Sequence, residues 1–405
     1  MRILCLCFYF EPDLSAGSFK NSALAVEIAR QLPEGSQVDV ITTWPNRYAS
    51  FEIDAQEDER RHNMRILRIR LPAHQSGMAD QSRAFISYAR GVLKHTRHET
   101  YDLVYASSSR LMMSVLGAWV SRRKKIPLYL DVRDLFVDTV KDVLPGKISI
   151  FFLPVFAQLE KWAVHCASHV NVVSGGFVQY FNQHYPDKKL SQYTNGIDQE
   201  YIMLSPSKAY NIAKPVPEIL YAGNIGEGQG LHRIIPRLAK RLEGQLTFRL
   251  IGAGGRQLQL QEALAKAGVT NVILHAPVSR SNLINFYKQA DILFLHLNDF
   301  DAFKKVLPSK IFEYGALGKP VWAGVSGYAA EFIVTHLDNA AVFQPCDVES
   351  AVQSFAGLDL KVQPRIRFIE RFSRHSIITQ MAEEIISFTK PLAIGSADDH
   401  NSGVE

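Results

Sequence analysis

The sequence predicts an α/β protein built from two Rossmann-like domains, each with a doubly wound parallel sheet. Short apolar runs of strand length alternate with segments of helical periodicity, which is typical of βαβ units. This pattern restarts once, after a proline-rich stretch at residues 205–217. The chain has 405 residues, which is too long for one ordinary hydrophobic core and favours two domains.

In the first half of the chain, apolar runs bounded by turn residues predict a series of buried strands. They lie at residues 2–10, 37–42, 64–71, 102–106, 127–131, 169–174 and 190–194. Between several of them, apolar residues recur with the period of an amphipathic helix. The helices predicted in this way lie at residues 18–32, 80–98, 110–124 and 176–183.

The second half repeats the alternation with a new set of strands and helices. The predicted strands lie at residues 218–222, 246–252, 271–275, 291–297, 320–324 and 340–343. The predicted helices lie at residues 231–242, 257–267, 281–289, 309–317, 328–335 and 348–357. Helical residues also extend over 365–390. Parallel strands need such crossover helices, so a second parallel sheet is expected.

These elements divide the chain into an N-terminal domain at residues 1–204 and a C-terminal domain at residues 218–375. The stretch between them, 205–217, has three prolines and no apolar periodicity, so it is interpreted as a linker. Residues 376–393 are predicted to form a C-terminal helix, and the sequence leaves open whether it packs on the N-terminal domain. Residues 394–405 are small and polar and are predicted to be disordered.

The charge balance is mildly basic, with a net charge of +5 and a pI near 8.9. Nucleic-acid-binding domains show stronger clustering of basic residues, so no nucleic-acid partner is expected. One basic cluster, residues 122–125, ends a predicted helix. It is either a solvated helix end or a contact for anionic lipid headgroups.

The cysteines and the amino terminus both favour a cytoplasmic protein. Cys5, Cys7, Cys166 and Cys346 form no CxxC motif, and a chain of this size needs no disulfides, so a reducing cytosol is expected. The apolar amino terminus lacks a signal-peptide cleavage site.

No apolar stretch is long enough for a transmembrane helix. The nearest approach is residues 148–157, which contain Pro154. This segment is interpreted either as a core segment or as an interfacial membrane contact, because Lys141 and Lys147 precede it and Lys161 follows.

Candidate site residues follow predicted strands, because doubly wound sheets bind ligands at the carboxyl ends of their strands. In the first half, the loop 11–17 ends at Gly17, where the backbone could approach an anion or simply turn. Asp131, Arg133 and Asp134 lie just past another strand. They form either a surface ion network or a polar catalytic group. The turn at 195–198 is interpreted first as a structural marker.

In the second half, two glycine-rich loops follow neighbouring strands. The first contains Gly223, Asn224 and Gly226, and the second contains Gly252 and Gly254 followed by Arg256. Such strand-to-helix turns suit a diphosphate, although these spacings differ from the Rossmann fingerprint.

Lys310 and Glu313 lie near the start of a short helix at residues 309–317. A lysine there meets phosphate where the helix dipole is also positive. A carboxylate one turn later can accept hydrogen bonds from both hydroxyls of a ribose. Together with the glycine-rich loops, these residues predict a nucleotide site.

No cofactor and no metal are expected. Asp299 and Asp301 form a DxD pair of the kind that can hold a divalent cation. However, Lys310 and a helix N-terminus could already balance the phosphates. The histidines include no HExxH motif, so a zinc site is not expected.

The sequence resembles glycosyltransferase family 4, the retaining enzymes of GT-B architecture, whose two Rossmann-like domains face a central cleft. The most specific motif is at 308–320, PSKIFEYGALGKP, supported by residues 223–226 and 250–254. Looser matches occur at 131–134 and 195–198. Within the family, the chain is most similar to bacterial N-acetyl-L-fucosamine transferases of O-antigen and capsule synthesis.

The resemblance implies that the C-terminal domain binds a UDP-sugar, with Glu313 on the ribose, Lys310 on the diphosphate and the glycine-rich loops lining the nucleotide site. It implies a polyprenyl-diphosphate-linked saccharide acceptor that enters from the N-terminal domain, at the inner face of the cell membrane. The transferred sugar is expected to be an N-acetylated amino or deoxyamino hexose. Asp134 is the predicted polar residue on the acceptor side, beside Gly17 and Arg133.

The sequence departs from the family pattern at three places. Lys305 stands where relatives keep a glutamate that contacts the donor sugar, so Asp301 or a backbone amide is expected there instead. Asn224 and Gln229 stand where many members carry arginine and lysine, and Arg256 is the expected replacement cation. The histidine of many members appears as Arg133.

Two other functions stay open. The first is a UDP-sugar 2-epimerase of the same architecture, which would need a set of catalytic carboxylates, with His and Arg, that the sequence does not display. The second is a non-catalytic scaffold with a decayed GT-B site, which the departures at Lys305 and Asn224 favour slightly.

Overall fold

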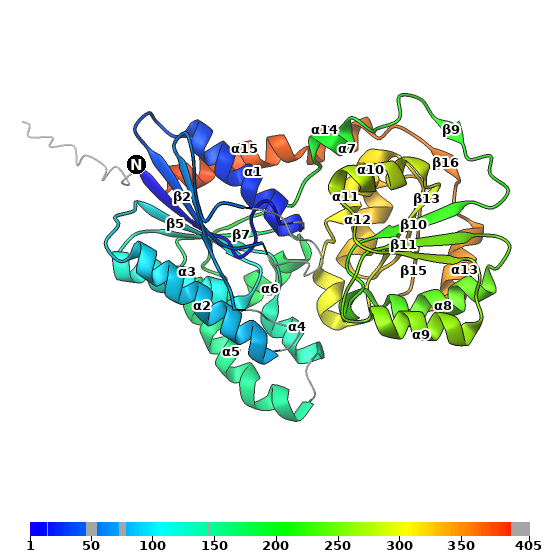
Figure 1. The fold of residues 1–405 in the computed structure, drawn as a ribbon, viewed down its shortest axis with the longest axis horizontal. Coiled ribbons are helices and arrows are strands. Elements are labelled where there is room, and N and C mark those ends of the chain that lie inside the picture. The colour runs from blue at the N-terminus through cyan, green and yellow to red at the C-terminus, as the bar shows by residue number, and fades with distance from the viewer. Residues whose placement is uncertain (14, 46–54, 73–77, 144–145, 390–405) are drawn as a thin grey trace, which may run out of the picture.

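The protein is described by a computed structural model that covers residues 1–13, 15–45, 55–72, 78–143 and 146–389. Two sheets lie side by side, each covered by helices on its faces (Figure 1). The predicted α/β class with two parallel-sheet domains is therefore confirmed.

The N-terminal sheet has eight strands in the order β3-β4-β2-β1-β5-β6-β7-β8. All neighbours pair in parallel except β3 and β4, which pair antiparallel at the edge. The strands are β1 (Arg2–Leu6), β2 (Gln37–Thr43), β3 (Asp58–Arg61), β4 (Met64–Ile69), β5 (Leu103–Ser108), β6 (Leu128–Val132), β7 (His169–Val172) and β8 (Leu190–Ser191). The strand order reverses between β1 and β5, which is where a doubly wound sheet opens a ligand-binding crevice.

The C-terminal sheet has six parallel strands in the order β12-β11-β10-β13-β14-β15. They are β10 (Glu218–Ala222), β11 (Thr247–Ile251), β12 (Val272–His275), β13 (Ile292–His296), β14 (Val321–Gly324) and β15 (Ala340–Phe343). Here the order reverses between β10 and β13. The loops after these two strands therefore open onto one crevice.

Helices cross between the strands, as parallel pairing requires. In the N-terminal domain they are α1 (Ala16–Gln31), α2 (Met78–Thr96), α3 (Leu111–Lys124), α4 (Phe136–Val143), α5 (Gly146–Cys166) and α6 (Gly176–His184). The short helix α7 (Gln199–Ile202) follows them in the chain but packs on α11 and joins the C-terminal core through Tyr201. In the C-terminal domain they are α8 (Leu231–Arg241), α9 (Gln257–Ala267), α10 (Arg280–Gln289), α11 (Lys310–Leu317), α12 (Tyr328–His336) and α13 (Val348–Ala356). Two short 3-10 helices, η1 (Glu227–Gln229) and η2 (Asp301–Lys305), lie in loops at the crevice.

The predicted helical stretch 365–390 is divided at Ser373. Its first part, α14 (Ile366–Phe372), stays with the C-terminal domain, where Phe368 and Phe372 join the core. Its second part, α15 (Arg374–Ser387), packs beside α1 (Figure 1). The apolar face of α15 joins the core of the N-terminal sheet through Ile378, Met381, Ala382 and Ile385.

The structure adds elements that the sequence patterns did not predict. Residues 148–157 belong to the long helix α5, which contains Pro154. Phe152 and Val155 on this helix are about half exposed, so the segment is not simply a core element. The predicted linker contains β9 (Tyr210–Asn211), which pairs with β16 (Lys361–Val362).

Among the described residues, no helix combines the length and the apolarity that crossing a membrane requires. The predicted disorder of residues 394–405 lies outside the part of the chain that the structure describes.

Candidate active site

A cavity of about 320 Å³ lies between the two domains, at the carboxyl ends of the C-terminal strands. The first half of the chain contributes Ser15, Ala16 and Phe19 at the start of α1, and Tyr201 on α7. The lining residues are Ser15, Ala16, Phe19, Tyr201, Ala222, Gly223, Asn224, Gln229, Ile251, Gly252, Pro277, Val278, Arg280, Leu283, Tyr287, Ser309, Lys310 and Glu313. The predicted residues Gly223, Asn224, Gly252, Lys310 and Glu313 are thus brought together.

The two glycine-rich loops pack directly on each other. Gly223 N–H donates to the Ile251 carbonyl at 2.8 Å, and Ile225 N–H donates to the Ala253 carbonyl at 2.9 Å. A β-carbon on Gly252 would lie 1.8 Å from the Gly223 carbonyl oxygen, and the φ angle of Gly252 is +147°. Only glycine fits such a position, so the loop sequences serve this close packing.

Lys310 reaches the cavity across the first of these loops. A β-carbon on Gly223 would lie 2.4 Å from Lys310 Nζ, so glycine leaves room for the ammonium group. The ammonium also lies 5.3 Å from the ring centre of Tyr221. A cation is therefore held beside backbone that is open to a ligand, at the start of α11, as phosphate binding requires.

Glu313 lies one turn further along α11 and is half-buried in the cavity wall. Tyr287 Oη donates a hydrogen bond to Glu313 Oε2 at 3.0 Å. Burial raises the pKa of Glu313, while Lys310 and the Tyr287 hydrogen bond oppose that rise. The result is a desolvated carboxylate, positioned to accept hydrogen bonds from a hydroxyl-bearing ligand.

An amide pair occupies the positions where many family members carry cations. Asn224 Nδ2 donates to Gln229 Oε1 at 2.8 Å, and both side chains line the cavity. The expected replacement cation, Arg256, does not line it. Its guanidinium instead pairs with Glu227 and donates to Gln259. Gly226 and Gly254 are likewise packed within the loops and outside the cavity lining.

Arg280 lines the cavity, although the sequence reasoning did not select it. Its guanidinium lies 4.3 Å from the ring centre of Phe19 on α1 and pairs with Asp198. It also pairs with Glu200 at 2.9 Å. Arg280 follows closely after the predicted strand at 271–275, so the rule that strand ends carry ligand-binding residues could have found it.

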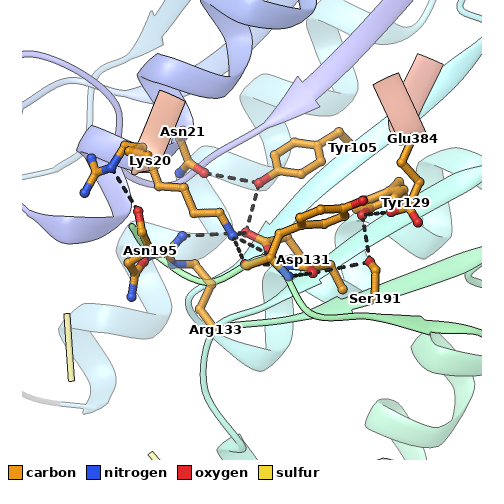
Figure 2. Close-up of polar contacts among 12 residues, drawn as sticks. Lys20, Asn21, Tyr105, Tyr129, Asp131, Arg133, Ser191, Asn195 and Glu384 are labelled. Atoms are coloured by element: carbon orange, nitrogen blue, oxygen red, sulfur yellow. Dashed lines mark hydrogen bonds and ion pairs between the residues drawn. The ribbon is translucent and has the colours of Figure 1, made fainter. Parts of the chain in front are cut away.

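On the N-terminal side, the predicted cluster around Asp131 is a buried charge network (Figure 2). Asp131 is 0% exposed, and Lys20 Nζ on α1 donates to its Oδ1 at 3.1 Å. Tyr105 and Asn171 also donate to this carboxylate, at 3.0 and 2.6 Å. Burial lowers the pKa of Lys20 to about 8, against the opposing effect of Asp131. The carboxylate of Asp131 is therefore paired and hydrogen-bonded entirely within the N-terminal domain, which indicates a structural role.

Arg133 connects this network to Asn195, in the segment where the chain leaves the N-terminal sheet for the C-terminal domain. It lies 3.6 Å from Asp131 and donates to Asn195 Oδ1 at 2.7 Å (Figure 2). A β-carbon on Gly17 would lie 3.7 Å from Arg133 Nε, so these two predicted residues are neighbours. They lie beside the cavity edge formed by Ser15 and Ala16.

Asp134 is not part of the central cavity. It is exposed and lines a separate small cavity of about 20 Å³ inside the N-terminal domain. β6 ends at Val132, so Asp134 lies two residues past the strand, and Arg133 does not line this small cavity. Its role on the acceptor side stays a prediction.

The residues discussed for sugar and metal contacts also lie outside the cavity lining. Lys305 Nζ lies 2.5 Å from Asp138 Oδ2 of the N-terminal domain. Asp301 is exposed and pairs with Lys304 at 2.6 Å. Within the described ranges, no group of three or more His, Cys, Asp or Glu side chains is arranged to hold a metal ion.

Comparison with known proteins assigns both halves of the chain. Residues 23–195 match the family model of the glycosyl transferase 4-like domain, and residues 206–370 match that of glycosyl transferases group 1. One curated relative is the putative colanic acid biosynthesis glycosyl transferase WcaI of Escherichia coli K12, which is 33% identical over 100 residues. That alignment covers 25% of this chain and 24% of the relative, so the matched segment spans about a quarter of WcaI.

Solved structures share the fold over nearly the whole chain. HepE of Anabaena, in complex with UDP and glucose, has a TM-score of 0.65 at 17% identity, covering 96% of this chain and 100% of HepE. WaaG, a glycosyltransferase involved in lipopolysaccharide biosynthesis, has a TM-score of 0.60 at 16% identity, covering 96% and 97%. The chain is therefore a glycosyltransferase with the GT-B fold, composed of a glycosyl transferase 4-like domain followed by a group 1 glycosyl transferase domain.

Proposed function

We propose that this chain transfers a sugar from a UDP-sugar to a lipid-linked saccharide, with retention of anomeric configuration, in surface polysaccharide synthesis. The sugar is an N-acetylated amino or deoxyamino hexose, and the acceptor carries a polyprenyl diphosphate. The observation that carries the proposal is that Lys310 and Glu313, one turn apart on α11, line one cavity beside two packed glycine-rich loops.

The geometry of the cavity supports a nucleotide diphosphate donor. In this proposal, Glu313 binds the ribose hydroxyls and Lys310 binds the diphosphate. HepE, which shares the fold, was crystallised with UDP and with UDP-glucose. We infer that UDP binds this chain in the same manner, without a metal ion, because Lys310 and the N-terminus of α11 supply the positive potential.

Transfer would proceed by attack of an acceptor hydroxyl on the face from which UDP departs. The bond between the anomeric carbon and the phosphate oxygen breaks as the new glycosidic bond forms. The acceptor proton passes to the departing phosphate oxygen. Lys310 stabilises the negative charge that develops on the diphosphate, and closure of the two domains positions the reactants.

A lipid-linked acceptor and a peripheral location at the inner membrane face are supported by the surface of the N-terminal domain. Phe152 and Val155 on α5 are 51% and 53% exposed. The basic cluster 122–125 ends α3 in the same domain, where Arg122 contacts Cys166 at the other end of α5. Apolar side chains together with basic ones suit an anionic membrane surface. WcaI and WaaG, by their names, belong to colanic acid and lipopolysaccharide synthesis.

The test is an assay of the purified chain with a panel of UDP-sugars and a polyprenyl-diphosphate-linked acceptor, with and without EDTA. We expect elongated lipid in both conditions. Lys310→Ala and Glu313→Ala should each lower kcat/KM about 10²-fold, which corresponds to about 3 kcal/mol of transition-state stabilisation. Lys240→Ala, which removes an exposed lysine on α8, is the matched control and should leave the rate unchanged.

Other outcomes would contradict the proposal. Free UDP without elongated lipid would mean hydrolysis. An isomerised sugar formed without acceptor would indicate the epimerase. Absence of UDP binding by calorimetry would indicate a scaffold.

A further inference from the structure

The 3-10 helix η2 belongs to the C-terminal domain but contacts the N-terminal domain. Its last residue, Lys305, forms an ion pair with Asp138 on α4, with Nζ 2.5 Å from Oδ2. The Lys305 carbonyl accepts a hydrogen bond from Ser174 Oγ at 2.6 Å. Both partners follow strands of the N-terminal sheet, so this contact joins the facing strand ends of the two domains.

The backbones approach closely at this contact. A β-carbon on Gly176 would lie 2.3 Å from the Lys305 carbonyl oxygen. The Lys305 ammonium also lies 5.5 Å from the ring centre of Tyr180 on α6. Side chain and main chain of Lys305 are thus both fitted to the N-terminal domain.

The two residues after Lys305 pack into different hydrophobic cores. Val306 packs against the hydrophobic core of the N-terminal domain. Leu307 is 4% exposed and belongs to the core of the C-terminal domain. Directly after Pro308, the side chains of Ser309 and Lys310 line the cavity. The segment that positions Lys310 is therefore held by both domains at once.

The same segment also supports the first glycine-rich loop. A β-carbon on Gly228 would lie 3.0 Å from the ring of Phe303 in η2. Asn298, which precedes η2, donates its backbone N–H to the Gly228 carbonyl at 2.8 Å. A displacement of η2 would consequently move both this loop and the start of α11.

We propose that Lys305 is a positioning residue of the transfer reaction. Through Asp138 and Ser174 it fixes the segment leading into Lys310, so that Lys310 reaches its working position only when the two domains are closed on each other. The inference rests on the proposed function for the identity of the reaction. The pair of Lys305 and Asp138 is partly exposed and contributes little to global stability, so its removal separates positioning from folding.

The test compares Lys305→Gln with Lys304→Gln. Lys304 is the neighbouring lysine and pairs within η2 with Asp301, so its variant removes the same charge without touching the Asp138 contact. We expect Lys305→Gln to lower kcat about tenfold and to weaken UDP binding, because Lys310 is then held less firmly at the diphosphate, whereas Lys304→Gln should change neither. Lys305→Arg, which keeps the charge, should recover most of the loss, and Asp138→Asn should reproduce it.

A second measurement needs no substrate. Small-angle X-ray scattering of the ligand-free protein should give a larger radius of gyration for Lys305→Gln than for the unaltered chain or Lys304→Gln. Equal kcat losses in both lysine variants, or an unchanged radius of gyration in Lys305→Gln, would overturn the inference. UDP calorimetry on the unaltered chain tests the proposed function separately, so failure of one claim is distinguishable from failure of the other.

Discussion

At the scale of single residues, the cavity combines charges whose environments differ. Lys310 lies beside the face of Tyr221, and Arg280 lies over Phe19 while it is neutralised by Asp198. Burial raises the pKa of Glu313, so this carboxylate is protonated at a higher pH than an exposed one. The affinity for the donor should therefore depend on whether Glu313 is ionised.

Lowering the pH should weaken UDP binding by protonating Glu313. Because burial raises the pKa of Glu313 above 4.5, protonation begins at a higher pH than for an ordinary glutamate. We expect Glu313→Gln to bind UDP more weakly at neutral pH and to lack this titration. Calorimetry on both proteins between about pH 5 and 8 measures the UDP affinity at each pH. UDP itself also titrates in this range, but it does so equally for both proteins, so the ratio of their affinities reports Glu313 alone.

Tyr287→Phe is the matched variant for this prediction. It removes the hydrogen bond that holds down the pKa of Glu313, so the loss of affinity should begin at a higher pH than in the unaltered chain. Identical pH profiles for the unaltered chain and Glu313→Gln would rule out a role of this carboxylate in binding.

At the scale of elements, strand ends hold the loops of the cavity. His296, the last residue of β13, is 0% exposed. Its Nδ1 lies 2.7 Å from the Gln229 carbonyl, and its Nε2 accepts the backbone N–H of Cys346 at 3.0 Å. A neutral imidazole that donates from Nδ1 satisfies both contacts. The strand thus fixes η1, whose Gln229 side chain orients Asn224 in the cavity.

Acid should destabilise the fold through His296. Burial lowers the pKa of His296 from 6.5 to about 4 in the folded chain. The unfolded chain therefore binds the proton first, and folding stability is lost as the pH falls from 6.5 towards about 4. We expect His296→Asn to be less stable at neutral pH. Its free energy of unfolding should also change less with pH in this window than that of the unaltered chain.

Urea unfolding at a series of pH values measures this effect. His165→Asn, which changes an exposed histidine on α5, serves as the control. Its free energy of unfolding should change with pH at the same slope as that of the unaltered chain. If His296→Asn kept the same slope, the imidazole would not be the titrating group.

At the scale of the whole molecule, the two domains are tied together at the chain crossings. The backbone of Ile197 accepts from Arg374 N–H at 2.9 Å, and Ile197 N–H donates to the Phe372 carbonyl at 2.8 Å. The Arg374 side chain donates to the Asn195 carbonyl and pairs with Asp198. After this crossing, α15 completes the N-terminal core beside α1 (Figure 1).

Removing α15 should unfold the N-terminal domain. A chain that ends at Phe372 loses Ile378, Met381 and Ile385, which are 3%, 0% and 0% exposed. At roughly 1.5–3 kcal/mol for each buried apolar side chain, the loss is comparable to the stability of a typical domain. We expect aggregation or an early unfolding transition in calorimetry. A chain that ends at Thr389 keeps α15 and should unfold like the full chain, and equal stability of both truncations would contradict this role of α15.

Much of the fold could be predicted from the sequence because parallel strands buried on both faces are continuous apolar runs. β10, β11, β13 and β14 all lie within predicted strands. Helix α5 was not predicted, because its apolar run contains Pro154 and reveals no amphipathic period. The division of the last helical stretch at Ser373 was also not predicted, since local propensity does not report which core a helix joins.

The sequence by itself determined the two parallel-sheet domains, the glycine-rich loops and the helix start that carries Lys310 and Glu313, because each depends on residues adjacent in the chain. Only the tertiary structure decided which charges line the cavity. Arg256 and Asp134 follow strands as Arg280 does, yet Arg256 pairs with Glu227, and Asp134 faces another cavity. Lys305 likewise pairs with Asp138 across the cleft. The direction of a long side chain depends on partners that are distant in sequence, and only the packing of the two domains supplies them.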